Sequence, residues 1–489
     1  MLFNSIDFLL FFPCVIIGYY LLPSKVRYLW LLAASYFFYG NWNPTYIWLL
    51  FGCTIFTYFS GLLIENYRTK KPALTKGILG ISIAAMLSVL AFYKYLDFGI
   101  GWINKILKLI YISQIEWKPD ILLPVGISFY TLQAMGYLID VYRKEVEAET
   151  NFFRYALFIA FFPQLVAGPI ERSKNLLRQL KKPTKFQYDN FRKGMLLIFW
   201  GLFCKMVIAD RVAIIVNNVY TNTDYKGFYI VYATVLFAVQ IYCDFYGYST
   251  IARGTALTMG ISLTDNFDAP YFSTSVKEFW RRWHISLSYW FRDYLYIPLG
   301  GNRKGNIRKQ VNLLIVFAIS GLWHGASLSF LLWGLLNGFY QVLGAGKYKL
   351  SKLLRKNQQP ERLSVKILNR IVTFGLITFA WLFFRAGSIS KSIRLIKGIF
   401  ETCNWTIFVD GSLYQLGVSK EILLTTYVAI LILAIVDWLK YKKIKVADMV
   451  MQQGWWFRAV CFIGLIIMTL LFGCYGVAYD TQQFIYFQF

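Results

Sequence analysis

Apolar residues in this chain form long stretches that are separated by short polar segments. A helix needs about 20 apolar residues to cross a bilayer, and several of the stretches are shorter than this or contain Gly and Pro. Irregular backbone is tolerated at membrane depth only inside protein or beside water, so we expect some helices to be tilted, buried or re-entrant. The pattern predicts helices over residues 7–22, 27–39, 46–64, 77–96, 121–139, 152–170, 194–208, 228–248, 311–343, 371–384, 423–439 and 457–476.

The composition supports a membrane protein and excludes a soluble one. The chain has 489 residues, of which 57% are hydrophobic and only 16% are charged, whereas a soluble domain carries roughly 25% charged residues. We therefore predict an all-α, polytopic protein with about 10–12 transmembrane or re-entrant helices. The sequence contains no internal repeat and, apart from the polar stretch 347–362, no long flexible linker, so we expect a single membrane domain over residues 1–489.

The remaining charge is strongly positive, with 51 Lys and Arg against 25 Asp and Glu. In a soluble protein this balance would suggest nucleic acid. Here the basic residues cluster between apolar stretches, at 68–76, 172–193, 347–370 and 440–445, as the positive-inside rule requires of cytoplasmic loops. We expect the lipid bilayer, not nucleic acid, as partner. If residues 152–170 are re-entrant, both termini lie outside.

Residues 311–343 have basic residues on both flanks, so both ends should face the cytoplasm. The stretch is too long for one crossing and too short for two full ones. We expect a hairpin that turns part-way through the bilayer, at the segment from Gly321 to Gly325, where glycines permit a break. This places His324 near the middle of the membrane.

The chain has only two histidines, His284 and His324. Histidine is the side chain best suited to move a proton near neutral pH, and polar groups at membrane depth tend to mark function. The alternative is that each ring is a buried hydrogen-bonding group with a structural role. With two histidines and scattered cysteines, we expect no metal site.

Bases alternate with aromatic residues between positions 277 and 308, and Arg281, Arg282 and Trp283 belong to this run. Arginines bind phosphate oxygens and aromatic faces stack on purines, which suits a nucleotide-bearing donor such as coenzyme A. An interfacial belt that anchors a helix among lipid headgroups would show the same composition. We expect Asp244 to balance one of the arginines, in a structural pair rather than in catalysis.

Several motifs resemble the membrane-bound O-acyltransferase (MBOAT) family, in its bacterial branch of alginate O-acetyltransferase-like proteins. The blocks around the two histidines are Arg-Arg-Trp-His-Ile-Ser-Leu-Ser and Gly-Leu-Trp-His-Gly-Ala. The other matching stretches are 123–130, 162–170, 242–254, 292–303 and 484–489.

The resemblance implies a multi-helix fold around a central tunnel, with a catalytic core at about residues 121–345 and a place in the bacterial inner membrane. It implies acetyl-CoA as cytoplasmic acyl donor, no bound cofactor, and an acetyl group that leaves toward a secreted SGNH-type partner protein or a polysaccharide acceptor. His324 falls on the usual catalytic histidine, and His284 on one with a supporting or donor-side role. Asn337 stands where many relatives carry a further histidine.

We hypothesise that His324 is a general base that deprotonates an acceptor hydroxyl, which then attacks the thioester carbonyl. Trp323, Asn302 or backbone N–H groups are candidate donors to the oxyanion. Within the enzyme class the alternative is D-alanyl transfer from a carrier-protein thioester toward teichoic acid. From other classes, the alternatives are a membrane transporter, which would not cleave a thioester, and a non-catalytic scaffold, which would tolerate loss of both histidines.

Overall fold

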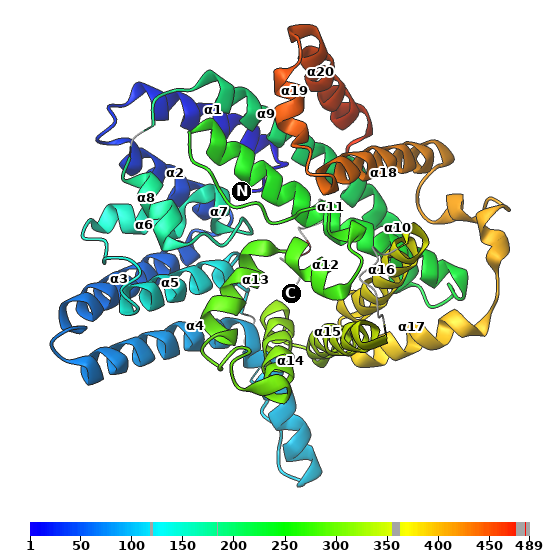
Figure 1. Cartoon of the computed structure of the whole chain (residues 1–489), viewed down its shortest axis with the longest axis horizontal. Coiled ribbons are helices and arrows are strands. Elements are labelled where there is room, and N and C mark those ends of the chain that lie inside the picture. Colours follow the sequence, from blue (N-terminus) through cyan, green and yellow to red (C-terminus); the bar gives the residue numbers. More distant parts are fainter. Residues whose placement is uncertain (118–120, 183, 355–361, 476–484, 486–489) are drawn as a thin grey trace. The chain divides into compact units, whose positions relative to one another are not determined.

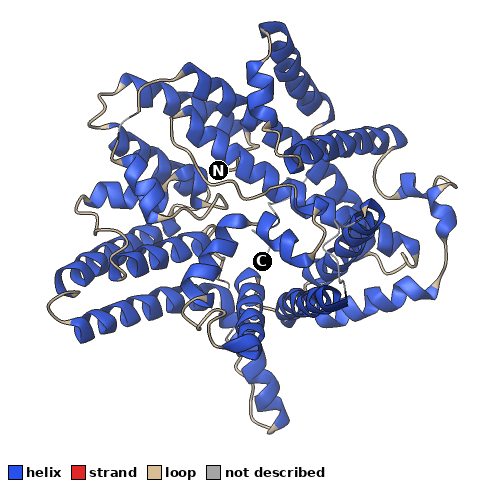
Figure 2. Ribbon diagram, viewed as in Figure 1, coloured by secondary structure: helices blue, strands red, loops and turns tan. Residues whose placement is uncertain are grey.

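The computed structural model describes residues 1–117, 121–182, 184–354, 362–475 and 485, with the side chains of 347–354 excepted. Apart from one isolated bridge between Phe267 and Trp283, every regular element in these residues is a helix, as Figure 2 shows. The predicted all-α class is therefore confirmed. The contacts divide the chain into two compact units, which are described separately.

Unit 1 comprises residues 1–195 and 252–264. Its centre is α5, whose residues are almost all buried and which packs against α3, α4, α6 and α8. Figure 1 shows α3, α4 and α5 running side by side. The helices of unit 1 are α1 (Ile6–Leu21), α2 (Arg27–Gly40), α3 (Thr45–Tyr67), α4 (Pro72–Leu109), α5 (Ile127–Tyr142), α6 (Phe152–Ala160), α7 (Phe162–Leu165) and α8 (Ser173–Leu180).

Unit 2 comprises residues 196–251 and 265–489. Two helices, α9 (Tyr188–Leu202) and α11 (Phe228–Thr258), continue from one unit into the other. The remaining elements are η1 (Phe203–Ala209), α10 (Asp210–Thr221), η2 (Pro270–Phe272), α12 (Val276–Arg282), α13 (Ile285–Phe291), η3 (Arg292–Tyr296), α14 (Gly305–His324), α15 (Leu328–Leu354), α16 (Leu363–Ala386), α17 (Ile389–Glu401), η4 (Trp405–Phe408), η5 (Ser412–Gln415), α18 (Lys420–Tyr441), α19 (Val446–Gln452) and α20 (Trp455–Phe472).

Among the described residues, seven helices are long and apolar enough to cross a membrane: α3, α4, α11, α15, α16, α18 and α20. The shorter apolar helix α1 adds to them. Only 6% of the apolar window of α20 is buried, so much of this helix is available to lipid tails. Each of the twelve segments predicted from the apolar pattern overlaps a helix, although residues 121–126 and 166–170 are not helical and residue 476 lies outside the described residues. The chain is a multi-pass membrane protein.

The segment predicted to be re-entrant, residues 152–170, is short and broken in the structure. Helix α6 has 9 residues, which span about 13 Å at 1.5 Å per residue, less than half of the roughly 30 Å hydrocarbon layer. The helix ends at Phe161, whose φ of −52° and ψ of 107° are not helical, and the four-residue α7 follows. This geometry agrees with a segment that enters the membrane without crossing it.

Residues 311–343 form the predicted hairpin, in which α14 packs along α15. The break lies at Gly325, whose backbone is extended, as predicted. The expectation that Gly321 also belongs to the turn is wrong, because Gly321 lies inside α14 and faces the backbone of Phe330. Each helix also extends beyond the apolar stretch, α14 before residue 311 and α15 after residue 343. The 20 residues of α14 span about 30 Å.

Two glycines bring α14 and α15 into backbone contact, and this contact generates a prediction. A Cβ added at Gly334 would overlap the carbonyl oxygen of Phe317 and lie 3.2 Å from the Cα of Gly321. We expect Gly334→Ala to destabilise the protein by about 1–3 kcal/mol, because overpacking forces the helices apart. The melting temperature of the purified protein in detergent measures this.

Gly344→Ala is the matched control, because Gly344 lies on the same helix and a Cβ there meets nothing within 4 Å. Alanine has the higher helix propensity, so this control should melt at the same temperature as the unmodified protein or slightly above it. Equal melting of the two variants would contradict the role assigned to the close contact.

Candidate active site

Both histidines belong to unit 2. His324 is the last residue of α14 and His284 lies between α12 and α13. Lys309 lies fifteen residues before His324 on α14, which places the two residues about 22 Å apart along the helix. The distance along α14 from its basic N-terminal turns to His324 is therefore most of the thickness of the hydrocarbon layer.

The imidazole of His324 is enclosed by aromatic rings. Its centroid lies 4.8 Å from that of Trp323, 5.1 Å from that of Trp333 and 5.4 Å from that of Phe384, all in edge-to-face geometry. These rings come from α14, α15 and α16, respectively. The side chain is only 6% exposed. The hairpin and α16 together therefore hold the imidazole in a buried position lined by aromatic rings.

Trp323 connects the two histidines. Its ring lies 4.8 Å from His324 and 6.3 Å from His284 between centroids. The ring of Phe245, from α11, also lies close to His284, with 4.6 Å between ring centroids. The structure thus brings together His284, Trp323 and His324, three residues that the sequence predicted for the site from two separate motifs.

The backbone at His284 has an unusual conformation that neighbouring residues hold in place. Its φ of 45° and ψ of 56° are left-handed, which is uncommon for a residue other than glycine. Asn266, which is fully buried, accepts the Ile285 N–H on its carbonyl oxygen at 3.0 Å and the Ser286 N–H on its Oδ1 at 3.2 Å. Its Nδ2 donates to the Ser249 hydroxyl at 3.3 Å.

Asn266 is a positioning residue that sequence reasoning missed. It acts on His284 through the backbone of the two following residues, so neither spacing nor periodicity indicates it. The available signal was the cluster of polar residues Asp265, Asn266 and Asp268, which begins seven residues after the end of the apolar helix α11. Trp333 and Phe384 were also missed, because large aromatic residues in apolar helices are equally typical of lipid-facing positions.

The other predicted binding residues lie in different surroundings. Trp283 is buried and packs on Trp381, with ring centroids 5.1 Å apart. Arg282 is half-buried and forms ion pairs with Asp268 at 2.9 Å and Glu278 at 3.0 Å. Arg281, by contrast, is exposed on the same short helix.

Asn302 is exposed in the turn before α14. The turn folds back along α14, because the side chain of Asn312 donates to the carbonyls of Leu299 at 3.3 Å and Gly301 at 3.0 Å. The twelve residues of α14 from Asn312 to His324 still span about 18 Å at 1.5 Å per residue. This separation removes Asn302 from the oxyanion donors for chemistry at His324 and leaves Trp323 as the side-chain candidate.

Asn337, which replaces a third imidazole, has a structural position. Its Oδ1 accepts the Trp280 Nε1–H at 3.1 Å, and its Nδ2 donates to the carbonyl of Trp333 at 2.8 Å. The amide therefore fixes the tryptophan that packs on Trp333, with ring centroids 5.7 Å apart. It reaches the surroundings of His324 through Trp333.

The prediction that Asp244 balances an arginine is wrong in the identity of the partner. Lys205, on the π-helical segment η1, forms ion pairs with Asp244 at 2.5 Å and with Asp210 at 2.8 Å. All three side chains are buried. The second oxygen of Asp244 accepts the N–H of Ile485 at 2.8 Å. The structural pairing that was expected is present, with a lysine as the cation.

Comparison with known proteins identifies the family to which this sequence belongs. A sequence model of the membrane-bound O-acyltransferase family matches residues 143–386. The chain is 36% identical over 412 residues to a probable alginate O-acetylase, AlgI, from Pseudomonas aeruginosa, covering 83% of this chain and 76% of that protein. The chain belongs to the membrane-bound O-acyltransferase family. It is therefore an O-acyltransferase, and the predicted family and enzyme class are confirmed.

Two further relatives of this O-acyltransferase differ in the reactions that they are named for. A peptidoglycan O-acetyltransferase from Helicobacter pylori is 36% identical over 433 residues, covering 82% of this chain and 80% of that protein. A teichoic acid D-alanyltransferase from Bacillus subtilis is 27% identical over 352 residues, covering 68% and 83%, respectively. The match of the family sequence model includes both histidines.

His284 of this O-acyltransferase lies outside the seven candidate spans, and its burial lowers the pKa of the imidazole from 6.5 to about 3. The folded protein therefore keeps the ring neutral while the unfolded chain takes up a proton below pH 6.5. We expect stability to fall between pH 6.5 and pH 3, at about 1.4 kcal/mol for each pH unit from this group.

Thermal unfolding of the wild type and His284→Gln, compared from pH 7.5 to pH 5, measures this contribution. Carboxylates titrate alike in both proteins, so the difference between the two isolates the histidine. The wild type should lose more stability on acidification than the variant. Parallel pH profiles would contradict a buried neutral imidazole.

Proposed function

We propose that this O-acyltransferase moves an acetyl group from cytoplasmic acetyl-CoA to a hydroxyl on the outer side of the bacterial inner membrane. The final acceptor is an extracytoplasmic polysaccharide, reached directly or through a secreted SGNH-type partner. Support comes from the relatives named as O-acetylating enzymes, which are 36% identical, against 27% for the D-alanyl relative. A transporter or an inactive scaffold gains no support from these relatives.

The observation that carries the proposal is the enclosed position of His324 at the end of α14. The beginning of this helix carries Arg308 and Lys309, and the positive-inside rule assigns that end to the cytoplasm. About 22 Å of helix then lies between Lys309 and His324, which takes the imidazole past the mid-membrane depth expected from the sequence and closer to the outer surface. Both termini, in the same topology, are extracytoplasmic.

In the proposed reaction His324 acts as general base. A ring nitrogen takes the proton of the acceptor hydroxyl, and the oxygen attacks the thioester carbonyl. The carbon–sulfur bond then breaks, the new ester leaves with the acetyl group, and the proton passes from the imidazolium to the sulfur of coenzyme A. The three aromatic rings around His324 exclude water, which would otherwise hydrolyse the thioester. The tunnel that would admit both substrates stays a prediction.

His324→Ala should lower acetyl transfer at least about 10²-fold, since the general base is lost. The assay uses the full-length protein in liposomes with acetyl-CoA and polysaccharide acceptors, with and without a candidate partner. It measures the free thiol of coenzyme A together with the acetylated product by mass. Melting temperature checks that the variant folds, and Gly344→Ala serves as the control, because its position is open and distant along α15 from the ring cluster.

Unchanged turnover in folded His324→Ala would refute the catalytic assignment. Transfer from a D-alanyl carrier-protein thioester, with none from acetyl-CoA, would instead establish the alternative reaction. Solute uptake by the liposomes without thioester cleavage would contradict an enzymatic role altogether.

Trp323 is the proposed oxyanion donor through its indole N–H. Trp323→Phe keeps an aromatic ring beside both histidines and removes the donor. We expect kcat to fall about 10²-fold or more with little change in KM, because a donor to the oxyanion acts on the transition state. Steady-state kinetics with acetyl-CoA measure both constants. A rise in KM at constant kcat would show that the tryptophan only positions the substrate.

A further inference from the structure

Unit 1 contains a cavity of about 290 Å³ that is strongly basic. Most of its lining comes from two segments that lie far apart in the sequence: the loop before α2 with the first turn of that helix, and the end of α8 with the loop that follows. Tyr19 of α1, Arg154 of α6 and Ile261 complete the lining. Neither histidine lines it. Five cationic side chains do: Lys25, Arg27, Arg154, Lys181 and Lys182.

The positive charge of this cavity is only partly compensated. Glu149, which is 2% exposed, forms ion pairs with Arg154 at 3.1 Å and with Lys181 at 2.9 Å. Within the part of the chain that the structure describes, no carboxylate forms an ion pair with the other three cations, Lys25, Arg27 and Lys182. Five cations therefore face one carboxylate, and the electrostatic field in the cavity favours an anion.

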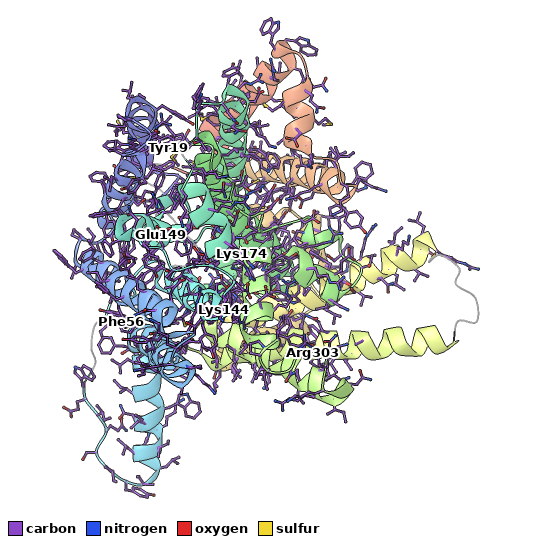
Figure 3. All side chains as sticks on the ribbon, turned by 60° about the vertical axis from the view of Figure 1, so that its left-hand side comes forward. Tyr19, Phe56, Lys144, Glu149, Lys174 and Arg303 are labelled. Carbon is purple, nitrogen blue, oxygen red and sulfur yellow. The ribbon has the colours of Figure 1, made fainter. Side chains whose placement is uncertain are left out.

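The cavity is held in shape by hydrogen bonds rather than being a loose gathering of surface lysines. The guanidinium of Arg27 donates to the carbonyls of Leu22 at 3.0 Å and Thr184 at 2.6 Å, which ties the two segments together. Thr184 also shares a 3.0 Å hydrogen bond with the hydroxyl of Tyr19, and Arg27 lies over the Tyr19 ring at 5.2 Å. Figure 3 labels Tyr19 and Glu149 in this region.

Position and size restrict the ligand. Basic loops face the cytoplasm, and in the predicted topology both segments lie on that side. The cavity therefore opens at the cytoplasmic membrane surface, where it can meet the phosphate groups of lipids and of soluble metabolites. A volume of about 290 Å³ lies at the small end of the range for ligand sites, roughly 300–1,000 Å³. It suits a phosphate with a short polar group rather than a whole nucleotide cofactor. The first turn of α2 adds the positive end of a helix dipole.

We propose that this cavity is a phosphate-binding site, separate from the histidines, which takes the phosphate of an anionic lipid headgroup or a soluble phosphate from the cytoplasm. Arg27 and Arg154 form its fixed base, since both are held by contacts within the protein. Lys25 and Lys182 are exposed at its rim and supply the charge that attracts the ligand.

The test measures binding to the purified full-length protein by titration in a non-ionic detergent. The two lipid probes are short-chain phosphatidylglycerol and, as its zwitterionic counterpart, phosphatidylcholine. The soluble probe is inorganic phosphate, compared with chloride at equal ionic strength. The variant is Lys25→Gln with Lys182→Gln, which removes two rim charges and no structural contact. Lys70→Gln with Lys71→Gln removes the same charge from exposed positions of unit 1 outside the cavity.

We expect the rim variant to bind the preferred anion about thirtyfold more weakly, since it loses two cations at an anionic interface. The control pair, and the charge-retaining pair Lys25→Arg with Lys182→Arg, should bind as the wild type does. Preference for phosphatidylglycerol over phosphatidylcholine identifies a lipid as the source, whereas saturable phosphate binding without that preference identifies a soluble ligand.

Two results would overturn the proposal. In the first, the rim variant binds both anions with the affinity of the wild type. In the second, the control pair weakens anion binding as much as the rim variant does, which would show a diffuse effect of charge. The readout is binding and not turnover, so failure here leaves the acyl-transfer proposal standing, and failure of that proposal leaves this one standing.

Discussion

Backbone contact between α14 and α15 is the interaction on which the geometry at His324 depends. Gly321 and Gly334 let the two helices meet without intervening side chains, and the chain reverses over the few residues after His324. The imidazole at the end of one helix then lies against Trp333 of the other. A wider separation would leave the ring without its aromatic enclosure, so two small residues determine where the His324 side chain is held.

His284 reaches the same cluster by a different route. Its left-handed backbone is held by Asn266, and its ring lies between Phe245 and Trp323. Helix packing thus places His324, whereas hydrogen bonds to Asn266 place His284. The two routes meet at Trp323, whose ring contacts both imidazoles, and this makes the indole a better candidate for electrostatic support than any residue on the exposed loops.

Much of the fold could be predicted because a bilayer permits little else. Apolar stretches in lipid must satisfy their own backbone groups, so each became a helix, and basic flanks on both sides of residues 311–343 required a hairpin. The site was harder. The motifs supplied His284, Trp323 and His324, but Trp333, Phe384 and Asn266 join them only through tertiary packing. Lys205 and Asp244 are 39 residues apart, a separation that no helical spacing rule connects.

The buried triad of Lys205, Asp210 and Asp244 has a consequence for how this sequence can change over time. Removing one member of a buried ion pair costs about 3–5 kcal/mol, because the remaining charge has no counterion, whereas replacing the group as a whole by apolar residues is often tolerated. Homologues should accordingly retain all three charges or lose them in concert. These positions would then appear as correlated columns in an alignment.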